Sequence, residues 1–174
     1  GGSNSMLYTL PALMDGLSIS ASYAPTGSGA AGTEAASGMS ATYTGVDGLS
    51  VSYGTGDGAT ANTSAEALKA SYAYGPITVA YSNYEFDADG TSSDDDTTSY
   101  KVSYTVSDEI SISYGTETVE RAALEDVETS RISASYTAGG MTISATMDEI
   151  ENMDGSTTAT QDRERWALGA SFAF

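Results

Sequence analysis

The sequence predicts an all-β fold, namely a transmembrane antiparallel up-and-down β-barrel of about eleven strands. Three observations lead to this prediction. Large apolar and small polar residues alternate in many short segments, and the connections between these segments alternate between short and long. In addition, none of the 174 residues lies in an apolar run of about 18 residues or more, which a membrane-spanning helix would need.

The clearest alternation lies in the last segment, residues 165–174. Large apolar residues occupy nearly every second position from Trp166 to Phe174, and small residues fill the gaps. Because successive side chains point to opposite faces of a strand, this segment predicts one apolar face and one small-residue face. Three aromatic rings on one face of a strand need an apolar environment, and in a transmembrane strand the lipid chains provide it.

The same alternation returns in ten earlier segments, most of which end in Tyr. One face carries Ile, Leu, Val, Met and Tyr, and the other carries mainly Ser, Thr, Ala and Gly. Such a pattern predicts that one face meets an apolar medium and the other meets water or a polar interior. With the last segment, the predicted strands are residues 6–8, 17–23, 39–43, 49–53, 68–72, 77–81, 100–104, 110–114, 132–136, 141–147 and 165–174.

The predicted connections form two sets that alternate along the chain. The short set is 10–16, 44–48, 75–76, 107–109 and 138–140, and the long set is 24–38, 54–67, 87–99, 116–130 and 148–164. The long set is rich in Gly, Ser, Thr, Asp and Glu, which favour loops. Tight turns at one rim and long loops at the other are typical of transmembrane barrels and are not expected in a soluble sandwich.

The composition excludes several kinds of chemistry. The chain has no Cys and no His, which removes disulfides, zinc–thiolate sites, thiol nucleophiles and Ser–His catalysis. Its formal net charge of -18 would repel a nucleic-acid backbone. We therefore expect no enzymatic activity, no cofactor and no nucleic-acid partner.

One acidic run offers oxygen ligands for a divalent cation. It consists of Asp94, Asp95 and Asp96. Carboxylate oxygens suit calcium or magnesium, but the Glu that closes an EF-hand loop is missing. Runs of like charge are usually exposed, so we predict a solvated acidic loop with at most weak cation binding and no metal site.

By the phase of the predicted strands, five of the six basic residues fall on the small-residue face, and only Arg121 has a mid-loop position. The five, which we predict to be pore-lining, are Lys69, Lys101, Arg131, Arg163 and Arg165. Lys69, Lys101 and Arg131 each precede a short turn by about five to seven residues, which predicts a common height of roughly 13 to 18 Å above the short-turn rim. Two interpretations remain open: these cations determine ion selectivity, or they only avoid lipid.

The aromatic residues of the apolar face are predicted to form two girdles, because amphipathic rings prefer the lipid headgroup level. The girdle at the short-turn rim would contain Tyr8, Tyr43, Tyr72, Tyr104, Tyr136 and Phe172. The girdle at the opposite interface would contain Tyr23, Tyr53, Tyr81, Tyr114 and Trp166.

Three features resemble the general porins of Gram-negative outer membranes: residues 4–8 (Asn-Ser-Met-Leu-Tyr) followed by residues 15–19 (Asp-Gly-Leu-Ser-Ile), the strands that end in Tyr, and the terminal Phe174. The resemblance implies a sixteen-stranded trimeric barrel with a constriction loop in the pore. Residues 1–174 would form the C-terminal part of one porin β-barrel domain, with the first five strands and the constriction loop preceding them.

The same resemblance implies a location in the outer membrane and insertion by the barrel assembly machinery, which would read Phe174 as its signal. It also implies a water-filled channel for passive diffusion of small hydrophilic solutes and ions. The acidic loops and the wide small-residue face favour this function. A structural or anchoring barrel of the autotransporter or adhesin type stays open as an alternative, and a soluble all-β surface protein is a third.

Overall fold

The computed structural model describes residues 4–26, 32–88, 94–156 and 161–173. It has a strand at each of the eleven predicted positions, which confirms the all-β prediction. The strands are β1 (Met6–Thr9), β2 (Leu17–Ala24), β3 (Ala36–Tyr43), β4 (Leu49–Asp57), β5 (Ser64–Tyr74), β6 (Ile77–Asp87), β7 (Asp95–Thr105), β8 (Ile110–Arg121), β9 (Val127–Ala138), β10 (Met141–Glu151) and β11 (Arg163–Phe172). Within the described ranges, no helix has the length and apolar character needed to cross a membrane.

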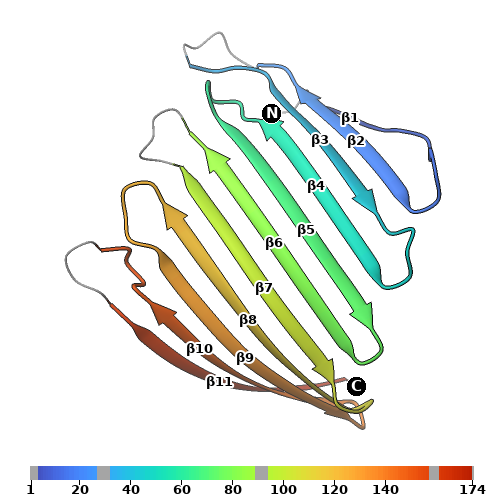
Figure 1. Ribbon diagram of the computed structural model, residues 1–174, viewed down its shortest axis with the longest axis vertical. Helices are drawn as coiled ribbons and strands as arrows, with labels where there is room; N and C mark the ends of the chain where they lie inside the picture. Colours follow the sequence, from blue (N-terminus) through green and yellow to red (C-terminus); the bar gives the residue numbers. More distant parts are fainter. Residues whose placement is uncertain (1–3, 27–31, 89–93, 157–160, 174) are drawn as a thin grey trace. The chain divides into compact units, whose positions relative to one another are not determined.

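The strands form one eleven-stranded sheet in which each strand is hydrogen-bonded to its neighbours in sequence, from β1 to β11 (Figure 1). The pairs are antiparallel, for example β2 with β3 and β9 with β10. This order is the predicted up-and-down meander. The chain divides into two compact units: Gly1–Ser71 with Ser82–Asp96 and Arg121–Ala123, and Tyr72–Tyr81 with Thr97–Glu120 and Leu124–Phe174.

In the first unit, the strand registers keep the two kinds of residue on separate faces. Ala41 on β3 lies opposite Ile19 on β2 and opposite Tyr53 on β4, which extends the apolar face across three strands. One residue further along β3, Thr42 lies opposite Ser52, and their hydroxyl oxygens are 3.0 Å apart. The alternation read from the sequence therefore continues from strand to strand.

The second unit shows the same separation over four strands. Tyr114, Ile132, Met147 and Trp166 lie opposite one another in turn, from β8 to β11. The neighbouring positions form a row of small residues: Ser113, Ser133, Thr146 and Ala167. Since each face is continuous, a side chain on the small-residue face has mainly polar neighbours.

The hairpin of β9 and β10 illustrates how the short turns are built. Ala138 lies opposite Met141, so only Gly139 and Gly140 connect the two strands. Their φ angles are 57° and 79°. Two-residue hairpin turns with positive φ at both positions match the right-handed twist of the strands, and glycine adopts them without the steric cost of a Cβ.

The strands extend further toward the long connections than predicted, which corrects several boundaries. β4 continues to Asp57, β8 to Arg121 and β10 to Glu151. As a consequence, the connection 122–126 is shorter than the connection 10–16, and the predicted sorting of loops by length holds only in part. Backbone pairing continues where side chains on both faces are polar, so apolar alternation marks only the middle of each strand.

No hydrophobic side chain is buried among the described residues, and many large ones are exposed, including Leu168 and Trp166. Asp148 and Asn152 are the only buried polar residues in this part of the chain. Two packed sheets would bury the apolar faces against each other. The apolar face of this sheet is instead open, as expected for strands that contact lipid.

Candidate functional site

A row of charged side chains crosses the small-residue face of the second unit. We call Lys101, Gly115, Arg131, Asp148 and Arg165 the charged row. Gly115 lies opposite Arg131, Arg131 opposite Asp148, and Asp148 opposite Arg165. A Cβ atom added to Gly115 would lie 3.7 Å from the Cβ of Lys101, so Lys101 is the next member on β7. The row therefore brings together three of the five basic residues singled out in the sequence.

Asp148 joins two of these cations. Arg131 donates from Nε to Oδ1 at 2.5 Å and from Nη2 to Oδ2 at 3.2 Å. The Nε of Arg165 lies 3.5 Å from Oδ2 of the same carboxylate. The side chain of Asp148 is 5% exposed, whereas those of Arg131 and Arg165 are 56% and 58% exposed. A planar guanidinium that binds a carboxylate through two bonds is held in a defined orientation.

Asp148 is a member of this site that was not predicted from the sequence, where it falls in the predicted connection 148–164. The residue belongs to β10 and continues the small-residue face after Thr142, Ser144 and Thr146. In a hairpin whose turn is Gly139 and Gly140, residues at equal distances before and after the turn lie opposite each other. Arg131 and Asp148 are at equal distances, so the turn could have identified Asp148 as the partner of Arg131.

The remaining basic residues are distributed over other positions. Arg163 lies opposite Ile150 and therefore on the same face as Arg165, two residues closer to the long connection. Lys69 is an exposed residue of β5 in the first unit. Arg121, predicted in a loop, is the last residue of β8, and its Nε lies 3.7 Å from Oδ1 of Asp95.

A cavity of about 310 Å³ opens over the Lys101 end of the charged row. We call it the Gly115 cavity, because the missing side chain of Gly115 leaves room between Lys101 and Arg131. Glu117 also lines it and accepts a hydrogen bond from Ser99 Oγ to Oε2 at 3.0 Å. Ser99, Ser113, Thr129 and Ser133 on the same face complete the wall with hydroxyl groups.

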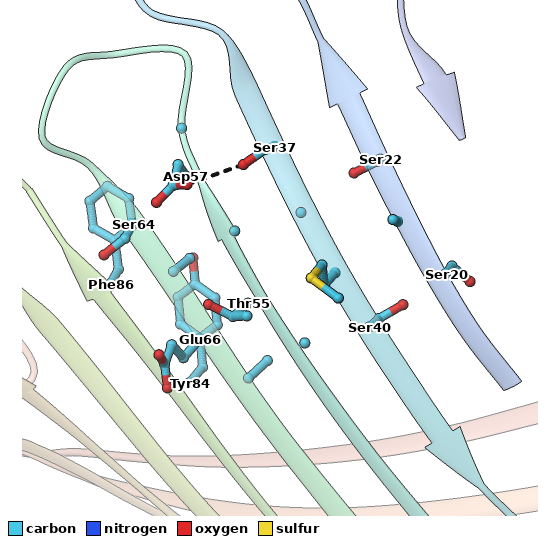
Figure 2. A pocket seen from close by; sticks show the side chains of 18 of the residues that line it. Ser20, Ser22, Ser37, Ser40, Thr55, Asp57, Ser64, Glu66, Tyr84 and Phe86 are labelled. Atoms are coloured by element: carbon cyan, nitrogen blue, oxygen red, sulfur yellow. Dashed lines mark hydrogen bonds between the residues drawn. The ribbon is translucent and has the colours of Figure 1, made fainter. Parts of the chain in front are cut away.

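The first unit contains a second hollow of about 410 Å³, with a floor of small residues. Figure 2 shows Ser20 and Ser22 on one side of it and Tyr84 and Phe86 on the other. Tyr84 and Phe86 belong to neither of the two predicted girdles. Tyr84 lies three residues after Tyr81 in β6, so its side chain has the opposite phase and falls on the small-residue face.

The acidic run is partly incorporated into a strand, which corrects the predicted solvated loop: β7 begins at Asp95. Each carboxylate contacts a different protein group. Asp94 accepts a bond from the Ala88 N–H, Asp95 pairs with Arg121, and Asp96 accepts a bond from Asn83. The described part of the chain contains no group of three acidic residues arranged to hold a metal ion.

The aromatic residues of the apolar face are largely uncovered. Tyr43 and Tyr81 are half-buried, and the other nine in the two predicted girdles are exposed. Trp166 shares a cross-strand row with Tyr114, and its Nε1–H donates to Glu164 at 2.7 Å. Phe172 lies opposite Met141, beside the short turn of β9 and β10. Phe174, the predicted insertion signal, lies outside the described residues.

An antiparallel meander with an exposed apolar face and a polar, charged opposite face defines a β-barrel protein of the outer membrane. A family model described as Gram-negative porin matches residues 1–128, and the chain belongs to this family. The resemblance noted in the sequence is thereby confirmed, and the protein is located in the outer membrane. The sequence matches no curated protein.

Two solved structures share the fold. The crystal structure of OccK8 (OprE) from Pseudomonas aeruginosa has a TM-score of 0.71 at 11% sequence identity, covering 91% of this chain and 59% of that chain. OmpT of Vibrio cholerae, an outer membrane protein solved as a loop L8 deletion mutant, has a TM-score of 0.65 at 18% identity, covering 97% of this chain and 62% of that one. The chain thus spans about three fifths of the length of these structures.

Proposed function

We propose that the protein forms a water-filled outer-membrane channel for passive diffusion of small hydrophilic solutes and ions, and that it is not an enzyme. The observation that carries this proposal is the charged row on the small-residue face. An Arg or Lys that faces lipid at the bilayer midplane costs about 2–4 kcal/mol, so a row of them is expected to face water. The family assignment supports the same function.

The charges of this face favour anions. In the second unit the face carries Lys101, Arg131, Arg163 and Arg165, against the two carboxylates of Glu117 and Asp148. Four positive and two negative charges leave a net charge of two positive on this part of the wall. A positive wall raises the local concentration of anions relative to cations. In the first unit, Lys69 would act in the same direction.

We extend the proposal to the domain and its partners. Residues 1–174 would be part of one porin β-barrel domain whose apolar face contacts outer-membrane lipid. The two aromatic girdles would mark the lipid interfaces. The assembly would be a homotrimer, inserted by the barrel assembly machinery through Phe174. Membership of the porin family supports these points.

The test is the reversal potential of the full-length protein in planar bilayers under a salt gradient. We expect the triple variant Lys69→Gln, Lys101→Gln, Arg131→Gln to shift selectivity toward cations, because three positive charges leave the wall. Glu149→Gln is the control and should leave the potential unchanged, since Glu149 lies opposite Ser130 on the other face of the sheet. An unchanged potential in the triple variant would mean that these cations do not determine selectivity. A protein that inserts but conducts no ions would instead favour the anchoring barrel.

A further inference from the structure

The Gly115 cavity combines charges of both signs in a defined arrangement. Glu117 lies two residues beyond Gly115 on β8 and opposite Thr129, so it is a diagonal neighbour of Arg131 on β9. The hydrogen bond from Ser99 places Glu117 beside β7, at a position two residues before Lys101. Diagonal neighbours in antiparallel sheets have Cα atoms roughly 7–8 Å apart. One carboxylate therefore faces two cations across the floor left open by Gly115.

Two of the three charged groups are already held in position and still have free hydrogen-bonding atoms. Arg131 uses Nε and Nη2 to bind Asp148, while its Nη1 donates to no group in the described part of the chain. Glu117 uses Oε2 to accept the bond from Ser99, which leaves Oε1 available. Lys101 makes no ion pair within the described ranges, so its ammonium group can adjust to a ligand. Groups that are fixed before binding lose less conformational entropy when a ligand arrives.

The local charge selects among ligand classes. Lys101, Arg131 and Arg165 carry three positive charges, and Glu117 and Asp148 carry two negative ones, so the cluster has one net positive charge but presents both signs at the cavity. A simple anion is attracted by the cations but repelled by Glu117, and a simple cation meets the reverse. A ligand with a carboxylate at one end and an ammonium at the other gains attraction at both ends.

We propose that the Gly115 cavity is a weak binding subsite for small zwitterions, of which an α-amino acid is the simplest. The carboxylate of the ligand lies against Arg131 and Lys101, and its ammonium group lies against Glu117. The cavity volume of about 310 Å³ is at the lower end of the roughly 300–1,000 Å³ found for small-molecule sites. The inference rests on the proposed channel function, because a solute reaches this face only through a water-filled lumen.

The experiment measures how added solutes reduce the potassium chloride current through single channels of the full-length protein at pH 7. The probes are L-glutamine, N-acetyl-L-glutamine, which lacks the ammonium group, and L-glutamine amide, which lacks the carboxylate. We expect L-glutamine to reduce the current with saturation, and each analogue to need at least about a tenfold higher concentration. In Glu117→Gln, the preference for L-glutamine over its N-acetyl analogue should largely disappear.

Glu149→Gln is the matched control. Glu149 lies opposite Ser130 on the other face of the sheet, so this variant removes the same charge without altering the cavity. It should keep the wild-type preference. A conducting channel that L-glutamine does not block, or equal effects of the two variants, would overturn the subsite and leave the channel function standing. A protein without any conductance would overturn the channel function itself.

Discussion

Arg131 and Asp148 lie directly opposite each other on β9 and β10 and are joined by two hydrogen bonds, of 2.5 Å and 3.2 Å. The carboxylate is nearly buried, and its second cation, Arg165, lies further away at 3.5 Å. Arg131 is therefore a paired cation of the wall, and Lys101 is an unpaired one within the described residues. The two should respond differently to substitution.

The first prediction concerns stability. Arg131→Gln should lower the free energy of unfolding of the full-length protein in detergent micelles by about 1–3 kcal/mol, because the buried carboxylate loses its two-bond partner. Lys101→Gln should change this free energy by less than about 0.5 kcal/mol, since its ammonium group is hydrated. Urea titrations followed by tryptophan fluorescence measure both. Equal losses in the two variants would contradict the distinction between paired and unpaired cations.

The second prediction concerns the sign of the selectivity change. Asp148→Asn removes a negative charge from the small-residue face and should move the reversal potential toward anions. Lys101→Gln removes a positive charge and should move it toward cations. Planar bilayers under a salt gradient provide the measurement, and Glu149→Gln, on the opposite face, provides the control. Shifts in the same direction for both wall variants would show that charge on this face does not control permeation.

The third prediction concerns the lipid interface. Trp166 is the only Trp of the chain, is exposed on the apolar face, and donates its N–H to Glu164. An indole with one polar end favours the headgroup level. The emission of Trp166 is the difference between the fluorescence of the wild-type protein and that of Trp166→Phe. Lipids brominated near the headgroup should quench this emission more strongly than lipids brominated near the chain end. Quenching by aqueous iodide alone would show that the ring faces water.

The fourth prediction concerns the turn that sets the register of β9 and β10. Gly140→Ala should lower the free energy of unfolding by about 1 kcal/mol, because its φ of 79° is costly for a residue with a Cβ. Gly54→Ala is the control, since Gly54 lies within β4 and an added Cβ would meet only ordinary contacts at 3.7 Å. This variant should be neutral or slightly stabilising. A larger loss for Gly54→Ala than for Gly140→Ala would contradict the argument.

Much of the fold follows from local patterns in the sequence. Alternation between apolar and small residues predicted all eleven strands and the division of side chains between two faces, because the period of two is a property of the extended backbone. The same pattern assigned Lys101, Arg131 and Arg165 to one face. With the register of the turn at Gly139 and Gly140, it also contained the pairing of Arg131 with Asp148, although the predicted strand ended one residue too early to include Asp148.

Other features depended on the tertiary structure. The ends of β4, β8 and β10 lie in polar sequence, where hydrogen bonding to the neighbouring strand, and not hydrophobic alternation, keeps the backbone extended. Arg165 and Asp148 lie on β11 and β10, which are joined by the long connection 152–162. The register of these two strands therefore cannot be deduced from the length of a tight turn. The sequence alone therefore determined the strands, their order and their faces, since these are local. Only the structure decided that Arg165 also meets Asp148, because no tight turn sets the alignment of β10 with β11.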